Sequence, residues 1–254
     1  DSRTVAKIAH SNPLVVFDRM IQNAVSYENQ IGPIVDCLAF MTPLALDCAS
    51  FMIVRFLKSG RMGAGKMSAK FEGAVSDWFK NLATFIGQFY AVNPSVEISG
   101  LLHYVVAQLN KGHTWELIII KEILAKVGGC ELVEQVNEEQ VQAFAGGDVL
   151  KRETMHLGKQ PKASVMRHLK DALFKPETGL LLLVLTAQQR NVIMFHSKEG
   201  QDMKLTGDEF DRCQSVLLQL VEFLGRKKDL ASYANMLPSI QVLCGEEFAL
   251  EPNI

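Results

Sequence analysis

Residues 69–92 read AKFEGAVSDWFKNLATFIGQFYAV, and this stretch decides the fold class. Its large apolar side chains recur at steps of three and four residues, which places them along one stripe of an α-helix. They are Phe71, Val75, Trp78, Phe79, Leu82, Phe85, Ile86 and Phe89. We therefore predict an amphipathic helix that begins near Ala69 and has one apolar face.

The same helical period extends to both sides of this stretch. Residues Phe210–Leu224 repeat it at full length, and Leu101–Leu109 and Val165–Leu173 repeat it over shorter spans. The pattern predicts a chain built of helices, because strands would show alternation every second residue. Residues Ile240–Cys244 are the best strand candidate, but five residues do not distinguish a strand from a buried helical turn.

Residues at the expected helix ends agree with this interpretation. Asn12-Pro13 and Thr42-Pro43 each place a capping residue before a proline at the first helical position. Thr206 and Glu209 have the spacing of a capping box ahead of the Phe210 stripe. Gly128-Gly129 and Gly146-Gly147 are expected to end helices or form turns, because glycine accepts left-handed backbone angles.

Several of these helices are apolar on more than one face. Leu117–Ile120 and Leu180–Leu185 are uninterrupted apolar runs, and a helix of this kind packs on two sides. We predict an all-α fold of stacked antiparallel helix pairs, a HEAT- or MIF4G-like α-solenoid. Residues 1–254 are expected to form a single elongated helical domain, with a subdivision near residues 129–163 as the alternative.

The size of the chain suits a protein with a stable core. Its 254 residues are 48% hydrophobic, and a chain of this length buries roughly 70–75% of its unfolded surface. Five widely spaced cysteines, an odd number, predict buried free thiols in a reducing compartment. The apolar run Gly179–Ala187 is far short of the ~20 residues of a membrane span, so we expect no membrane partner. Because the sequence begins at Asp1, we expect a fragment of a longer polypeptide.

No motif predicts an enzyme. Gly60–Ser68 reads GRMGAGKMS and resembles a phosphate-binding loop, but Met67 stands where a Ser or Thr must bind magnesium. The residues before it look helical, whereas such a loop follows a strand. We therefore expect an interhelical loop. The six histidines and five cysteines lack zinc-ligand spacing, and no GxSxG elbow occurs. We predict a chain without catalytic residues, cofactor or metal.

Charge is nearly balanced overall and uneven locally. The net charge is −2, whereas a general polyanion binder is usually far more basic. One acidic stretch has no compensating base within it: Glu131, Glu134, Glu138 and Glu139. In the following stretch, residues 151–170, Glu153 is the only acidic residue. Its six basic residues are Lys151, Arg152, Lys159, Lys162, Arg167 and Lys170. A smaller basic cluster comprises Lys58, Arg61, Lys66 and Lys70.

Two interpretations of these charges remain open. They can form a solvated surface on which opposite charges pair within the domain. Alternatively, the basic residues attract an acidic partner or an RNA backbone. The 151–170 stretch lacks aromatic side chains that could stack on bases, which weakens the RNA version.

The candidate partner-binding residues form two groups. Lys151, Arg152, Lys159 and Lys162 are expected in a cationic loop, because Gly158 and Pro161 interrupt the middle of the basic stretch. Gln189, Arg190 and Asn191 form a polar break directly after the most apolar run. The alternative for this second group is that it merely ends a buried helix face.

Seven phrases, in order and at close spacing, resemble the family of the largest subunit of the THO transcription–export complex. They are KIAHSNPLVVFD (Lys7–Asp18), LLHYVVAQLNKG (Leu101–Gly112), WELIIIKEILAKVGG (Trp115–Gly129), RHLKDALF (Arg167–Phe174), LTAQQRN (Leu185–Asn191), MKLTGDEFDRC (Met203–Cys213) and LPSIQVLC (Leu237–Cys244). The resemblance covers nearly the whole chain and is thinnest at residues 48–87 and 154–163. None of the phrases is a catalytic signature.

The resemblance implies a nuclear, non-catalytic scaffold that assembles with the other THO subunits and couples transcription to mRNA packaging and export. It also implies a central, MIF4G-like segment that holds the two lobes of a DEAD-box RNA-dependent ATPase. Two other hypotheses stay open at this point: direct RNA binding through the basic residues 151–170, and an internal strut that contacts only other THO subunits.

Overall fold

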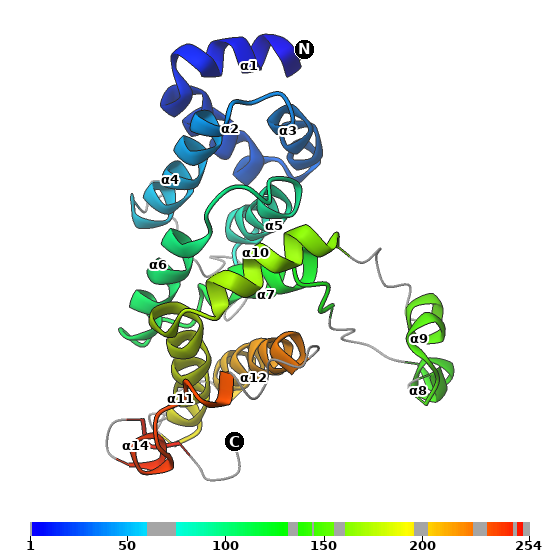
Figure 1. Cartoon of the computed structure of the whole chain (residues 1–254), viewed down its shortest axis with the longest axis vertical. Helices are drawn as coiled ribbons and strands as arrows, with labels where there is room; N and C mark the ends of the chain where they lie inside the picture. Colours follow the sequence, from blue (N-terminus) through cyan, green and yellow to red (C-terminus); the bar gives the residue numbers. More distant parts are fainter. Residues whose placement is uncertain are drawn as a thin grey trace.

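The computed structural model describes residues 2–59, 75–131, 137–143, 145–154, 161–195, 203–225, 233–245 and 248–250. Within these residues the chain is mostly helical and contains no extended strand, which confirms the predicted all-α fold. Figure 1 shows the helices stacked along the long axis of the molecule, with α1 at one end and α11, α12 and α14 at the other. This layered arrangement is the predicted helical solenoid.

The first layer contains α1 (Ser2–Ser11), α2 (Pro13–Ser26), the 3₁₀ turn η1 (Glu28–Gln30), α3 (Ile31–Leu38) and α4 (Pro43–Ser59). Both predicted proline starts are confirmed, since α2 begins at Pro13 and α4 at Pro43. The Oγ1 atom of Thr42 accepts a hydrogen bond from the Ala45 N–H at 3.3 Å, as a cap should. Asn12 precedes α2 without such a side-chain cap.

The second layer contains α5 (Asp77–Val92), α6 (Ser99–Leu109) and α7 (Leu117–Lys126). Phe79, Leu82, Phe85, Ile86 and Phe89 of the predicted stripe are at most 1% exposed and form the centre of the core. The prediction that this helix begins near Ala69 is wrong for residues 75 and 76, which precede the helix in the structure. Ser76 has extended backbone angles, and the helix begins at Asp77. The Asp77 carboxylate in the first turn interacts favourably with the positive end of the helix dipole. Residues 60–74 lie outside the described residues.

Helix α7 packs between α5 on one side and α12 on the other, as its apolar run predicted. It ends at the predicted glycine pair, where Gly129 has a φ of +65°. The Cys130 N–H then donates to the Leu124 carbonyl at 2.9 Å, which closes the helix end.

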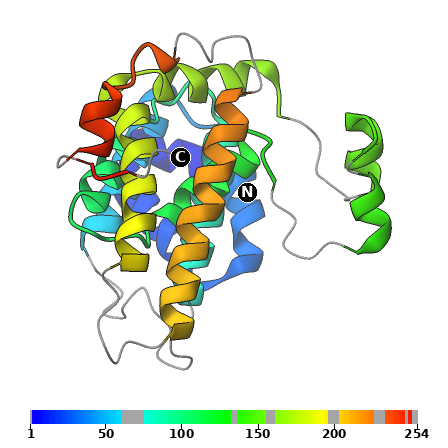
Figure 2. The ribbon, with the colours of Figure 1, turned by 90° about the horizontal axis from the view of Figure 1, so that it is seen from below.

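Two short helices follow, α8 (Glu138–Ala143) and α9 (Asp148–Thr154), joined through the predicted turn at Gly146-Gly147. They pack on each other, and Figures 1 and 2 both show them standing apart from the stack. Their position coincides with the subdivision considered near residues 129–163. The division of the chain into domains stays a prediction.

The last part comprises α10 (Ala163–Leu173), a π-helical turn η2 (Pro176–Leu180), α11 (Leu181–Phe195), α12 (Met203–Gly225) and α14 (Ile240–Cys244). Figure 2 shows α11 and α12 side by side. A Cβ on Gly179 in η2 would collide with the Leu173 carbonyl, so only glycine fits this tight junction between α10 and α11.

Two boundary predictions in this part are corrected. Helix α12 begins at Met203, one turn before Thr206, so Thr206 and Glu209 lie inside the helix and do not form its capping box. The strand candidate Ile240–Cys244 is helix α14, and none of its residues is buried. The apolar residues of this segment therefore indicated neither the conformation of its backbone nor the burial of its side chains.

By length and composition, the continuous helical stretch Glu177–Phe195 could cross a membrane, and half of its most apolar window is buried inside the molecule. This is weak support for a span, because core helices of soluble proteins have the same property. Helix α11 packs against α6, α12 and η2, which explains its apolar run as core. The expectation that the chain has no membrane partner stays a prediction.

Candidate functional site

The structure describes only part of the predicted cationic loop. Lys151 and Arg152 lie in helix α9 of the α8–α9 hairpin, while Lys162 is exposed at the residue before α10 on the stack. Lys159 and the side chains of Lys151 and Arg152 lie outside what the structure describes. The expectation of a loop is therefore wrong for Lys151 and Arg152, because the seven residues from Asp148 continue as helix from the glycine turn.

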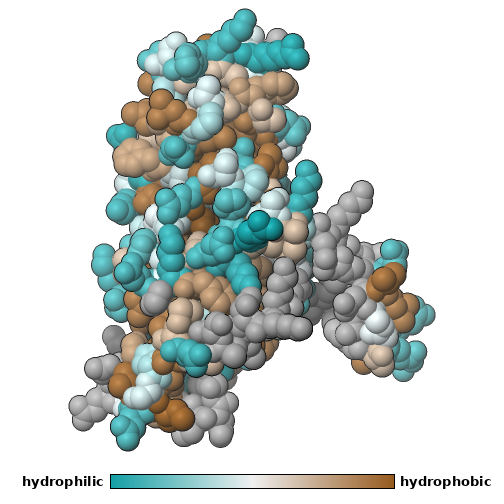
Figure 3. All heavy atoms as spheres, viewed as in Figure 1, coloured by the Kyte–Doolittle hydropathy of each residue, from teal (hydrophilic) through white to brown (hydrophobic). Residues whose placement is uncertain are grey.

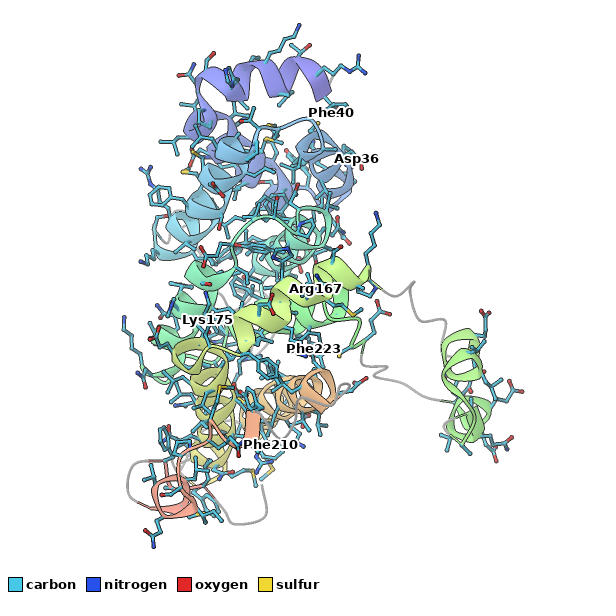
Figure 4. All side chains as sticks on the ribbon, in the orientation of Figure 1. Asp36, Phe40, Arg167, Lys175, Phe210 and Phe223 are labelled. Atoms are coloured by element: carbon cyan, nitrogen blue, oxygen red, sulfur yellow. The ribbon has the colours of Figure 1, made fainter. Side chains whose placement is uncertain are left out.

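Helix α10 carries Arg167 and Lys170 of the basic stretch, and two cations in this part of the stack, Lys170 and Lys175, have partners close by. The Lys170 ammonium lies 5.1 Å from the Phe174 ring centroid, a cation–π distance. The Lys175 ammonium lies 3.5 Å from the Glu97 carboxylate and 3.3 Å from the Ser99 hydroxyl. The hydrogen bond from Ser99 and the charge of Lys175 lower the pKa of Glu97. Figure 4 labels Arg167 and Lys175 on this part of the stack.

The exposed face of α10 therefore has mixed charge. Arg167 and His168 are exposed next to exposed Asp171, which is four residues after Arg167 on the same helix. Opposite charges also meet at the acidic stretch, where Glu131 lies 3.8 Å from Lys126. Glu131 thus has a compensating base from outside the stretch. Both observations favour the interpretation of a solvated surface with local pairing.

The second candidate group lies at a junction inside the molecule. Gln189 donates to the Leu109 carbonyl at the end of α6 at 3.2 Å. Arg190 donates to Gln214 of α12 at 2.9 Å and to the neighbouring Asn191 side chain at 3.1 Å. These contacts give the polar break a structural reason, because its side chains tie α11 to α6 and α12. A role for these residues in partner binding stays a prediction.

A further pair at the same junction was not found from the sequence. The Arg212 guanidinium of α12 stacks on the Trp115 ring, 4.0 Å from its centroid, and donates to the Thr114 hydroxyl at 3.4 Å. Burial lowers the pKa of Arg212. No local pattern could reveal this pair, since its members are almost one hundred positions apart. We call these contacts among residues 109–116, 189–191 and 212–214 the α6–α7 junction.

The outer face of α4 carries exposed apolar side chains that sequence reasoning also missed. Leu44 is 72% exposed and Phe51 is 59% exposed, two helical turns apart. Figure 3 shows hydrophobic atoms on this flank of the upper stack. The spacing of Leu44 and Phe51 on one face, together with Asp47 and Arg55, was the signal that could have found it.

The described residues contain no group of three or more His, Cys, Asp or Glu side chains that could hold a metal ion. All five cysteines are free thiols; Cys130 and Cys213 are buried, whereas Cys244 is exposed. The prediction of buried thiols therefore holds for only part of the set. The phosphate-loop-like segment Gly60–Ser68 lies outside the described residues.

Sequence comparison relates the chain to known proteins. A sequence model of a family described as a transcription- and export-related complex subunit matches residues 5–83. THO complex subunit 2 of Homo sapiens is 35% identical to the chain over 246 residues, which are 96% of the chain. This chain belongs to the THO complex subunit 2 family.

Other THO complex subunit 2 sequences agree. The protein of Arabidopsis thaliana is 31% identical over 95% of the chain, and that of Saccharomyces cerevisiae is 22% identical over 95%. The resemblance seen in the seven phrases is thereby confirmed. The chain spans only 13–15% of the length of these relatives, so the activity and partners of the whole protein are treated as proposals.

Proposed function

We propose that this chain is a non-catalytic scaffold segment of a THO/TREX complex, which couples transcription to mRNA packaging and export in the nucleus. The observation that carries the proposal is the similarity to THO complex subunit 2 over nearly the whole chain. The stacked helices support it, because solenoids present long surfaces for other proteins. The other THO subunits are the first expected partners.

The second part of the proposal is that the stack binds a DEAD-box RNA-dependent ATPase. Support comes from the layered helical architecture, together with the resemblance, which implies a MIF4G-like segment in this family. A rigid stack that binds one arrangement of the two ATPase lobes more tightly than another shifts the populations of these arrangements. Catalysis then belongs to the partner, and the chain supplies differential binding.

Binding and ATP turnover test this proposal together. The chain is immobilised, the matching DEAD-box ATPase is applied at micromolar concentration, and turnover is measured with and without the chain. We expect saturable binding and a changed turnover rate. Absence of binding at these concentrations contradicts the ATPase part. A different result would support an internal strut: altering the stack surface would prevent assembly of the THO complex and leave ATP turnover unchanged.

Direct RNA binding through residues 151–170 is the alternative, and the structure gives it less support. Its basic residues divide between the α8–α9 hairpin and α10, and the Lys170 ammonium already lies 5.1 Å from the Phe174 ring centroid. A phosphate contact would make affinity fall steeply as salt rises. RNA affinity that depends on salt and weakens on Lys162→Glu would restore this alternative, and Lys80→Glu on α5 is the matched exposed control.

A further inference from the structure

The α8–α9 hairpin is a protruding element with its own internal order. Its two helices pack on each other, and both ribbon views show it outside the stack (Figures 1 and 2). Asn137 and Gln140 form a reciprocal capping box, in which the Gln140 N–H donates to the Asn137 side chain at 2.9 Å and the Asn137 N–H donates back at 3.0 Å. The start of α8 is therefore fixed.

The end of α9 is also held. The Gln140 side-chain amide donates to the Thr154 carbonyl at 3.1 Å, which joins the beginning of α8 to the end of α9. The Thr154 hydroxyl donates to the Leu150 carbonyl at 2.8 Å. The turn at Gly146 lies close to the Leu150 side chain of α9. These contacts preorganise the hairpin.

The hairpin nevertheless exposes its apolar side chains. Val149 is 76% exposed, Val141 is 56% exposed and Leu150 is 53% exposed. Among its described side chains only Ala143 is buried. Helices of six and seven residues are marginal in water without tertiary packing. A covering surface would bury these apolar side chains, which the described residues of the chain leave exposed.

The charge of the hairpin indicates what that surface carries. Glu138, Glu139 and Glu153 are exposed around the apolar side chains. Over residues 137–154 the sequence has four acidic residues and two basic ones, a net charge of 4 − 2 = 2 negative charges. Complementary potentials favour a partner whose apolar surface is bordered by cations.

We propose that α8–α9 is a docking element that places Val141, Val149 and Leu150 in an apolar groove, bordered by Lys or Arg side chains, on another protein subunit. The inference rests on the proposed scaffold function but not on the ATPase. Apolar anchors from short helices in a groove are a common mode of protein recognition. The acidic rim fixes the orientation and excludes partners with an acidic border.

Site-specific photo-crosslinking in the full-length protein tests the proposal. A photoreactive residue replaces Val149 in the purified, assembled complex, and the crosslinked peptide is sequenced. A matched control replaces Leu44, which is 72% exposed on α4. We expect position 149 to capture one defined segment of another subunit, rich in apolar side chains and flanked by Lys or Arg. The control is expected to capture a different segment or none.

Four outcomes overturn the proposal: no crosslink, a crosslink to the stack of the same chain, a crosslink to a second copy, or a crosslink to RNA. A captured segment bordered by acidic residues overturns it too. The second variant combines Glu138→Lys and Glu139→Lys. It should lower the crosslink yield about tenfold, the effect of losing a well-placed interface contact. An unchanged yield contradicts the acidic-rim argument and with it the proposed partner chemistry.

The same preparation separates this proposal from the proposed function. A defined crosslink from position 149, together with no ATPase binding, leaves the docking element standing and removes the ATPase part. ATPase binding without any crosslink from position 149 supports the ATPase part and removes the docking element.

Discussion

At the scale of single residues, the α6–α7 junction shows how distant positions hold three helices together. Three side chains donate hydrogen bonds to backbone or side-chain groups of another segment: Gln189, Arg190 and Arg212. Buried polar atoms are costly without such partners. The junction therefore constrains where α11 and α12 can lie relative to α6.

We expect Arg212→Ala to destabilise the chain by about 1–2 kcal/mol, because it removes the cation–π contact with half-buried Trp115. Arg212→Lys should recover only part of this, since an ammonium cannot stack as a planar guanidinium does. Urea denaturation measures both, and the control Arg55→Ala on the exposed face of α4 should change stability by less than ~0.5 kcal/mol. Equal losses for Arg212→Ala and Arg55→Ala would show that the stacking contributes nothing.

A second prediction at this scale concerns thiol reactivity. Burial raises the pKa of Cys213 to about 12, so its thiol stays protonated in the folded chain. At about pH 8, alkylation should modify exposed Cys244 and leave Cys213 unmodified until urea is added, because the thiolate is the nucleophile. Mass spectrometry of the peptides measures this. Rapid labelling of Cys213 in the folded chain would mean that it is not buried.

The raised pKa of Cys213 also determines how the stability of the folded chain changes with pH. The folded-state pKa of Cys213 lies above the ordinary thiol value of 9.0, so folding disfavours the thiolate. Its contribution is fully present below that value and is lost as pH rises from there toward about 12. Burial raises the pKa of Tyr90 to about 12 in the same direction. Stability is therefore expected to fall on the alkaline side.

At the scale of helices, two apparently equivalent starts differ. Thr42 caps α4 with a side-chain hydrogen bond, whereas Asn12 precedes α2 without one. We expect Thr42→Ala to cost about 0.5–2 kcal/mol, the usual range for a lost cap, and Asn12→Ala to cost less than that. Thermal unfolding of the two variants measures the difference. A larger loss for Asn12→Ala would contradict the assignment of the caps.

The sequence predicted helices well where a long stripe met a clear boundary residue. The α5 stripe, the Pro13 and Pro43 starts and the Gly129 end all depend on local geometry, which the letters contain. Thr206 shows the limit, since the same capping pattern also occurs inside a helix, here one turn after α12 begins at Met203. The loop expected at Lys151 and Arg152 was wrong because helix α9 starts directly after the glycine turn and includes both residues.

At the scale of the molecule, the stacked helices present surfaces of different character. The centre is apolar and continuous through α5, α7 and the buried face of α12. The α4 face and the α8–α9 hairpin expose apolar side chains, while α10 exposes mixed charge. The proposed scaffold role needs several separate contact surfaces, and this arrangement offers them.

The central claim is that this stack serves as a platform for a DEAD-box ATPase within a THO complex. Crosslinking mass spectrometry of the chain with the matching ATPase tests it most directly. The account predicts reproducible crosslinks from lysines of the stack, such as Lys162 and Lys175, to both lobes of the ATPase, lost when unlabelled chain is added in excess. A complex in which the ATPase crosslinks extensively to other segments or subunits, and not to this stack, would contradict it.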